Sequence, residues 1–532
     1  MLSKNMRLTR ARTPESAGVS SEAFIKTLKY LEEKNVLYHS LMVVRHGKVA
    51  AECYREPFSK DIPHVMYSVS KTITATAIGF AIDEGYIKLE TRFVDIFPEF
   101  SPKKRDEKLE KLEVRHLLTM TSGKQPSYLL SKTDKDWMKH FTDAKWISEP
   151  GEKFEYVNEN IYVLCAILHR VTGISVTDFL YERLFLPLGI EKPFWETDHD
   201  GIEAGGWGIF LKTEDLAKIM LCYLNEGKFG KNQVIPKDWA KKATLNQAAI
   251  KGTPIREKGY GYCIWTENEN EYRADGMYSQ LGVVLEDKDA VIVFTSCSVD
   301  VETIWSAFDI LKAEGFIKAD TSVKSSPEYK EFVKNRPLDI VPLSERRSPL
   351  EDIITGRTIK FKNDLILNTI GSPLSVLSSA DVYMSKNRAG NINNVSFDFS
   401  INENELMFTW QEKDEVNTIS CGLDGKYRFT PIVLAGSPYT AAAAAYWLDN
   451  YTLEVWIRPI ESLARRVLRF SFQGDSVVMT PTGEPPAQFF LSSVSDFVRD
   501  MFSQKQLKDI AGASIKVLES LLEPLHYGKF ID

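Results

Sequence analysis

The sequence MYSVSKTITATAIGFAIDEG occupies residues 66–85 and joins a candidate reactive pair to an apolar helix. Ser68 and Lys71 lie three positions apart at its start, so one helical turn brings both side chains to one face. A lysine amine whose pKa is lowered by burial can accept the proton of a serine hydroxyl and make that hydroxyl a nucleophile. The spacing alone also fits a capped helix with an exposed lysine. The residues that follow are apolar almost all round, however, which predicts a buried helix that ends at Gly85, with the lysine at its mouth.

Two further strings carry side chains suited to catalysis. Tyr156-Val157-Asn158 precedes a second apolar helix. A tyrosine beside an ammonium group can share proton transfer, and an asparagine amide can hold a substrate amide; an aromatic residue followed by a helix cap is the alternative. The third string, residues 272–280, places Gly276 in a predicted strand, where glycine permits close backbone approach by a ligand, or else marks a bulge or turn.

Taken in this order, the strings resemble the serine β-lactamase-like superfamily, which includes class C β-lactamases, D-alanyl-D-alanine carboxypeptidases and related esterases and amidases. Five blocks carry the resemblance: residues 66–90, VRHLLTMTSG at 114–123, EPGEKFEYVNENIYVLCAILHRVTG at 149–173, GGWGIFLKTEDLAKIMLCYLNEGKFG at 205–230, and the strands of 260–298. It extends over roughly residues 15–315.

The resemblance implies a role for each matching residue. Ser68 would form the acyl-enzyme, Lys71 would activate it, and Tyr156 would relay the proton to the leaving group. The backbone N–H groups of Ser68 and of residues 277–280 would form the oxyanion hole. The residues expected to bind substrate are Asn158, Asp275, Gly276, Ser279 and Gln280. His116 is expected to be structural, and Gly205 and Gly206 either shape the pocket wall or form an ordinary turn.

The third string departs from the pattern of the lactam-recognising members, which carry a cation and a hydroxyl before the glycine. Here the sequence is Arg273-Ala274-Asp275-Gly276, and alternation along a strand puts Arg273 and Asp275 on one face. Asp275 would repel a substrate carboxylate if it faced the pocket. We therefore expect a serine hydrolase acting on an ester, amide or D-amino-acid peptide. The alternative is a penicillin-binding or sensor-like protein that acylates slowly or not at all and binds a ligand or partner.

The fold class expected is α+β: a β-lactamase-like antiparallel sheet flanked by helices with a helical subdomain, then an antiparallel β-barrel-like domain and a short helical tail. The short alternating segments beyond the proline-rich stretch resemble a lipocalin-like domain. Five alanines at 441–445 favour a helix by propensity but are assigned to this β region. The expected boundaries are 1–320 for the hydrolase domain, 321–350 for a linker, 351–488 for the β domain and 489–532 for the tail.

The amino-acid composition limits the partners, cofactors and cellular location that we expect for this protein. With 66 basic and 73 acidic residues, the net charge of −7 gives no basic surface for nucleic acid. Neither a secretory apolar segment nor a run of about 18 apolar residues is seen, so a cytoplasmic protein without a membrane partner is expected. The six cysteines have no metal-like spacing, and neither a metal nor a cofactor is expected. The expected partner is a small-molecule or peptide substrate; a homo-oligomer stays open.

Overall fold

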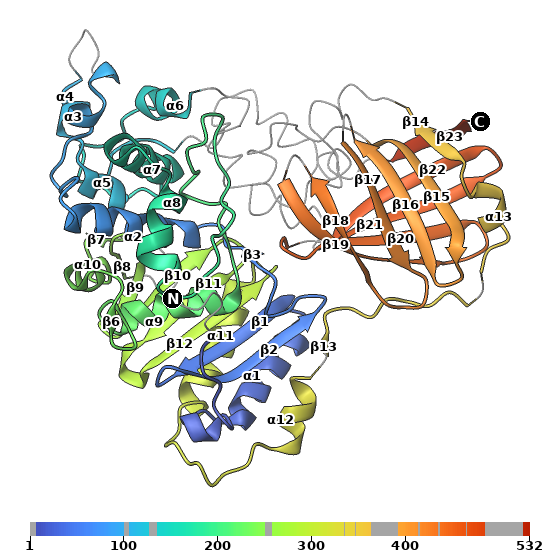
Figure 1. The fold of residues 1–532 in the computed structure, drawn as a ribbon, viewed down its shortest axis with the longest axis horizontal. Helices are drawn as coiled ribbons and strands as arrows, with labels where there is room; N and C mark the ends of the chain where they lie inside the picture. Colours follow the sequence, from blue (N-terminus) through green and yellow to red (C-terminus); the bar gives the residue numbers. More distant parts are fainter. Residues whose placement is uncertain are drawn as a thin grey trace. The chain divides into compact units, whose positions relative to one another are not determined.

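A computed structural model shows two compact units, one extending to Arg336 and the other starting at Pro337 (Figure 1). The structure describes residues 7–100, 106–126, 136–250, 258–334, 336–345, 347–362, 392–412, 415–434, 437–463, 465–484 and 525–531. The expected α+β class is confirmed, with helices and strands in the first unit and mainly strands among the described residues of the second.

The first unit is built on a nine-stranded sheet, and every neighbouring pair from β2 to β7 is antiparallel. In spatial order its strands are β13 (Arg336–Pro337), β2 (Lys48–Glu56), β1 (Tyr38–Arg45), β12 (Ala290–Ser296), β11 (Gln280–Leu285), β10 (Glu271–Gly276), β9 (Trp265–Asn268), β8 (Gly259–Tyr260) and β7 (Ala248–Ala249). The central strands β1, β11 and β12 are almost completely buried, which explains their runs of valine, isoleucine and leucine.

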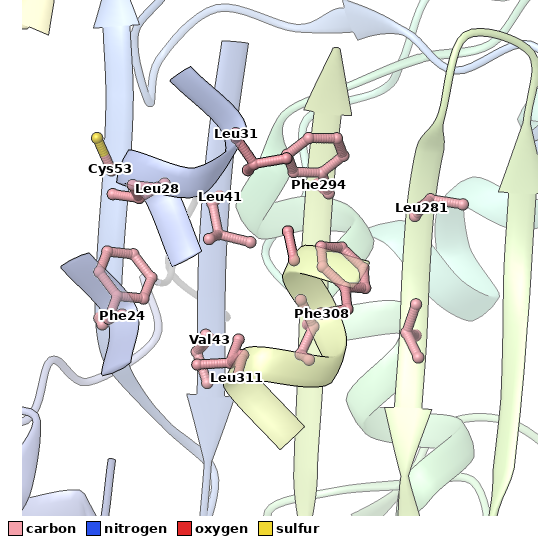
Figure 2. Close-up of a cluster of buried hydrophobic side chains, with 14 of the residues drawn as sticks. Phe24, Leu28, Leu31, Leu41, Val43, Cys53, Leu281, Phe294, Phe308 and Leu311 are labelled. Carbon is pink, nitrogen blue, oxygen red and sulfur yellow. The ribbon is translucent and has the colours of Figure 1, made fainter. Parts of the chain in front are cut away.

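One face of this sheet is covered by α1 (Ser21–Glu33) and α11 (Val301–Glu314), the first and last long helices of the unit. Figure 2 shows Phe24 and Leu28 of α1 on one side of Leu41 of β1 and Phe308 of α11 on its other side, all in one apolar cluster. All four side chains are fully buried. The two ends of the unit are therefore joined through one apolar core, which fixes the sheet that carries the third sequence string.

The other face carries α9 (Thr213–Leu224), which packs on β11 and β12, while α2 (Val69–Asp83) contacts the end of β10. Helix α2 also packs on α7 (Asn158–Thr172), and smaller helices contact α7, α2 or one another. Those elements are α3 (Phe93–Ile96), η2 (Pro98–Phe100), α4 (Glu107–Lys111), α5 (Val114–Leu118), α6 (Trp137–Asp143), α8 (Val176–Leu180), η3 (Tyr181–Phe185) and α10 (Lys237–Ala243). As the sequence predicts, α2 is buried on all sides over residues 69–81.

The second unit is a ten-stranded sheet in which β17 also pairs with β19, at Gly422 and Ala444, and so closes the sheet into a barrel. Its elements are α13 (Glu351–Ile354), β14 (Thr358–Phe361), β15 (Ile392–Asn402), β16 (Glu405–Glu412), β17 (Glu415–Gly422), β18 (Arg428–Leu434), β19 (Ser437–Trp447), β20 (Thr452–Pro459), β21 (Arg465–Gln473), β22 (Ser476–Glu484) and β23 (His526–Ile531). The alanines at 441–445 are indeed in strand β19. Aromatic rings such as Phe397, Phe408 and Phe470 contact one another in the core.

In two segments the structure differs from what the sequence predicts. The stretch 321–350 contains helix α12 (Pro327–Phe332), and Tyr329 and Phe332 pack against the core of the first unit. Of the expected helical tail, residues 489–524 lie outside the described residues, and His526–Ile531 form strand β23 between β14 and β22. This strand is held by pairing with strands distant in sequence, so the helical expectation does not hold there.

Within the described residues, no single helix has both the length and the apolar composition to cross a membrane; one pair, Asn158–Thr172 with Val176–Phe185, meets those criteria jointly but is bent by 74°.

Candidate active site

Ser68 lies where the chain leaves β3 (His64–Val65) and enters α2. The residue before it, Tyr67, has φ of 45°, a left-handed conformation that costs an L-residue about 1–2 kcal/mol. Such strain is typical of sites where the backbone must present one side chain in a fixed direction. Ser68 occupies the N-cap position of α2, yet its side chain makes no capping hydrogen bond. The partly exposed hydroxyl is directed instead to Lys71.

Lys71 is buried, with 1% of its surface exposed. Its Nζ lies 2.8 Å from Ser68 Oγ and donates a 2.6 Å hydrogen bond to the carbonyl of Gly206. Burial lowers the pKa of the Lys71 amine from 10.5 to about 7, with weaker opposing effects from Cys263 and Glu159. An amine with this pKa is neutral in a large share of molecules near neutral pH and can accept the serine proton.

Tyr156 lies beside this pair. Lys71 Nζ is 4.8 Å from the centre of the Tyr156 ring, and the ring stacks on Trp265 of β9 at 5.7 Å. The structure thus brings together the three residues expected to be catalytic. Trp265 was not singled out in the sequence, although it closes the aromatic string YGYCIW at 260–265, and that string was the available signal.

Asn158 begins helix α7, and its backbone approaches the Gly205–Gly206 turn. A Cβ atom at Gly206 would lie 3.2 Å from the Asn158 carbonyl oxygen and 3.6 Å from Lys71 Nζ. Gly205 has φ of +68° and would bring a Cβ to within 2.5 Å of Cys165 Sγ. Both glycines are therefore needed for the turn to pass close to α7 and offer its carbonyl to Lys71.

Gly276 ends β10 against the chain that leads to Ser68. A Cβ atom there would lie 2.3 Å from the Met66 carbonyl oxygen, so no larger residue fits. The glycine was expected to admit a ligand; the close approach observed is to the protein's own backbone. It fixes the edge of the hairpin β10–β11 next to the nucleophile.

The turn of that hairpin is strained and firmly held. Tyr278 and Ser279 have φ of 60° and 62°, and the Tyr278 ring contacts the Tyr67 ring edge-on at 5.6 Å. Gln280 is fully buried, and its side-chain amide donates to the carbonyls of Met277, Tyr278 and Ser296 at 3.2, 3.1 and 2.7 Å. Gln280, expected to bind substrate, thus holds the turn in place, while Ser279 donates to the Ser298 carbonyl at 3.2 Å.

Arg273 and Asp275 share a face of β10, as alternation predicts. Arg273 Nε donates to Asp275 Oδ2 at 2.8 Å. The arginine side chain is 2% exposed and its guanidinium lies 4.9 Å from the centre of the Trp305 ring, whereas the Asp275 side chain is 28% exposed. The aspartate is therefore the member of this pair that reaches solvent.

A cavity of about 420 Å³ connects these features. Its described lining comprises Ser68, Tyr156, Trp265, Asp275, Gly276, Met277, Tyr278, Ser279, Leu281, Ser298, Val299, Val301 and Trp305. Of the residues expected to bind substrate, Asp275, Gly276 and Ser279 line it, and Asn158 and Gln280 are not among these residues. No sequence pattern indicates that Trp305 and Val301 form a wall of the cavity, because α11 reaches the cavity only through its packing on the sheet.

His116 lies apart from the reacting groups. Its Nδ1 accepts a hydrogen bond from the backbone N–H of Glu113 at 3.1 Å and so caps helix α5. Burial lowers the pKa of the ring to about 4, which keeps it neutral and able to accept this bond. This is the structural role expected for His116.

Known proteins are similar in sequence to part of this chain. The 6-aminohexanoate-dimer hydrolase of Paenarthrobacter ureafaciens is 25% identical over 248 residues, which is 43% of this chain and 63% of that protein. Penicillin-binding protein 4 of Amycolatopsis lactamdurans is 31% identical over 130 residues, 24% of this chain and 34% of that protein. The chain thus spans less than two thirds of either relative.

A solved structure shows the same fold. The Bacillus anthracis protein described as a proposed 6-aminohexanoate-dimer hydrolase superposes with a TM-score of 0.50 at 23% identity, over 58% of this chain and 88% of that one. The Beta-lactamase family profile matches residues 29–302, just over half of the 532 residues and the part that contains Ser68, Lys71 and Tyr156. The chain belongs to the Beta-lactamase family.

Proposed function

We propose that this protein is a serine hydrolase that forms an acyl-enzyme on Ser68 and acts on an ester, amide or D-amino-acid peptide. The observation that carries the proposal is the contact of 2.8 Å between Ser68 Oγ and a buried Lys71 amine whose pKa is about 7. Hydrolases among the family's named relatives support the reaction class.

In the first half of the reaction, the neutral Lys71 amine accepts the proton of the Ser68 hydroxyl while Oγ bonds to the substrate carbonyl carbon. The carbonyl oxygen becomes an oxyanion beside the N-terminus of α2 and the turn 277–279, whose backbone N–H groups are the proposed donors. The bond to the leaving group then breaks, and that group receives the proton from Lys71 through Tyr156. This leaves an ester between Ser68 and the acyl group.

In the second half, water attacks the acyl carbon while Lys71 accepts a proton from it, and Lys71 then returns this proton to Ser68 Oγ as the bond between Oγ and the acyl carbon breaks. The product acid leaves and the hydroxyl is restored. Lys71, positioned by the Gly206 carbonyl, thus acts as a base in both halves.

The test compares wild type with Ser68→Ala, using a p-nitrophenyl ester, a D-alanyl-D-alanine peptide and a chromogenic cephalosporin as substrates, and a fluorophosphonate as label. We expect multiple turnover of at least one substrate and labelling of Ser68 by mass spectrometry, both abolished in Ser68→Ala. Ser322→Ala, which changes an exposed serine remote from the cavity, is the matched control and should behave as wild type. If the wild type showed no turnover and no labelling of Ser68, that result would contradict the proposal.

A penicillin-binding or sensor-like role is the second candidate, and the similarity to penicillin-binding protein 4 favours it. Such a protein would be labelled stoichiometrically at Ser68 and release the acyl group slowly. A burst of one product equivalent per chain without further turnover would identify this role.

A further inference from the structure

The cavity beside Ser68 has an unusual chemical character. Among the described residues that line it, Asp275 is the one with a formal charge. Four aromatic side chains also line it, Tyr156, Trp265, Tyr278 and Trp305. Aromatic faces and a carboxylate are the groups that attract an organic cation, because the ring faces and the carboxylate are both negative.

These groups share one side of the sheet. Trp265 of β9 is paired with Arg273 of β10, and Leu281 of β11 is paired with Asp275. Residues directly opposite on antiparallel strands point to the same face, so Trp265, Asp275 and Leu281 border the same space. Tyr156 stacks on Trp265 and also contacts Lys71, which links this space to the nucleophile.

Arg273 forms an ion pair with Asp275 but does not cover it. Its guanidinium is 2% exposed and lies on Trp305, whereas Asp275 is 28% exposed and lines the cavity. The contact between the two uses Nε and Oδ2 and fixes the direction of the carboxylate. A ligand entering the cavity therefore meets the aspartate with the arginine behind it.

Resting on the proposed Ser68 hydrolase, we propose that the substrate carries an ammonium group, which binds beside the Asp275 carboxylate among the aromatic side chains that line the cavity. The substrate class is then a cationic ester or amide with an apolar body. A free carboxylate at the same position would be disfavoured.

The experiment uses the full chain and pairs of substrates that differ by a quaternary nitrogen or a carbon. One pair is the p-nitrophenyl esters of 4-(trimethylammonio)butyrate and 5,5-dimethylhexanoate, with the cation on the acyl side. The other is butyrylthiocholine and S-(3,3-dimethylbutyl) thiobutyrate, with the cation on the leaving group. We expect the cationic member of at least one pair to have a kcat/KM about tenfold higher, the order of one well-formed ionic contact.

Asp275→Asn should reduce that ratio about tenfold, whatever its effect on both esters together, and Asp275→Glu should restore most of the ratio. Asp287→Asn, which removes an exposed carboxylate elsewhere in the unit, should leave the ratio unchanged. Ratios near one in the wild type for both pairs, or ratios unaffected by Asp275→Asn, would overturn the proposal.

Binding of a cation is measured separately from hydrolysis, so that a failure of the hydrolase proposal can be told apart from a failure of the cation-site proposal. Choline and its neutral isostere 3,3-dimethylbutan-1-ol are titrated calorimetrically into wild type and Asp275→Asn. Tighter binding of choline that is lost in Asp275→Asn supports the cation site even in a chain without turnover. Equal binding of the two compounds by wild type contradicts it even in an active hydrolase.

Discussion

At the scale of single residues, the catalytic proposal depends on where Lys71 lies. The spacing of Ser68 and Lys71 predicts their contact, because side chains three residues apart on a helix are neighbours. The Gly206 carbonyl that holds the amine is 135 positions away in sequence, and no local pattern indicates it. Burial lowers the pKa of this amine, and the charges of Cys263 and Glu159 oppose that shift only in part.

The first prediction concerns pH. Because the pKa of Lys71 is lowered from 10.5 to about 7, the base is neutral above pH 7 and protonated below it. The kcat/KM for a neutral ester should therefore fall about tenfold per pH unit below that value and level off above it. Measurement from pH 5 to 9 checks this. Lys71→Arg, whose side chain stays protonated, should be at least about 100-fold slower and lack this titration; a wild-type profile that is flat between pH 6 and 8 would contradict the assignment.

At the scale of elements, the hairpin β10–β11 fixes one wall of the site through two buried features. Gly276 lets β10 approach Met66, and Gln280 ties the turn to β12 through the Ser296 carbonyl. The sequence indicates a strand with a glycine here, but not what approaches it, since that depends on how α2 packs on the sheet. In the same way, alternation predicts the shared face of Arg273 and Asp275 but not their exposures.

Replacing Gly276 by alanine should disable the site. The new Cβ would lie 2.3 Å from the Met66 carbonyl oxygen, so the backbone that carries Ser68 must shift. A displacement of about 1 Å there can cost about 100-fold in rate. We expect at least that loss in kcat/KM for a p-nitrophenyl ester. Gly282→Ala on the neighbouring strand, where the Cβ would meet the flexible Met220 side chain at 2.9 Å, should retain much more activity; equal losses in the two variants would argue against this explanation.

Gln280→Met keeps the length of the side chain and removes its donors. Three carbonyls would lose a hydrogen bond, two of which are buried. This loss should lower the free energy of unfolding by about 1–3 kcal/mol and loosen the turn that lines the cavity. Denaturant unfolding and ester kinetics measure both effects. Gln233→Met also removes an amide that donates to two carbonyls, outside the cavity, and should leave kcat/KM unchanged. Full activity in Gln280→Met would show that the turn does not depend on this residue.

For the whole molecule, the sequence predicts the fold class of each of the two units better than it predicts the residues at which each unit begins and ends. Alternating apolar residues predict the strands of the second unit, because one face of each strand is buried there. Strand β23 is missed because its partners, β14 and β22, are distant in sequence. The stretch 321–350 has the composition of a linker, yet Tyr329 contributes to the core of the first unit and Asp339 binds within the second.

The last prediction rests on the fact that the buried core of the first unit and the buried ion pairs of the second unit are formed by different residues. Asp339 accepts hydrogen bonds from Tyr427 at 3.0 Å, Arg458 at 3.1 Å and Arg465 at 2.6 Å, and Arg458 is 1% exposed. Asp339→Ala removes the shorter of the two carboxylate contacts of Arg458 and leaves Glu484 as its remaining carboxylate partner, which should cost the barrel about 1–3 kcal/mol. Leu28→Ala should cost the first unit about 2–5 kcal/mol.

Calorimetry of the full chain should therefore show two unfolding transitions that respond separately. Asp339→Ala should lower the temperature of one and leave the other within about 1 °C, and Leu28→Ala should do the reverse. Ester hydrolysis assigns the transitions, since activity should be lost on heating together with the one that Leu28→Ala lowers. A single transition lowered by both substitutions would mean that the two units unfold as one cooperative structure.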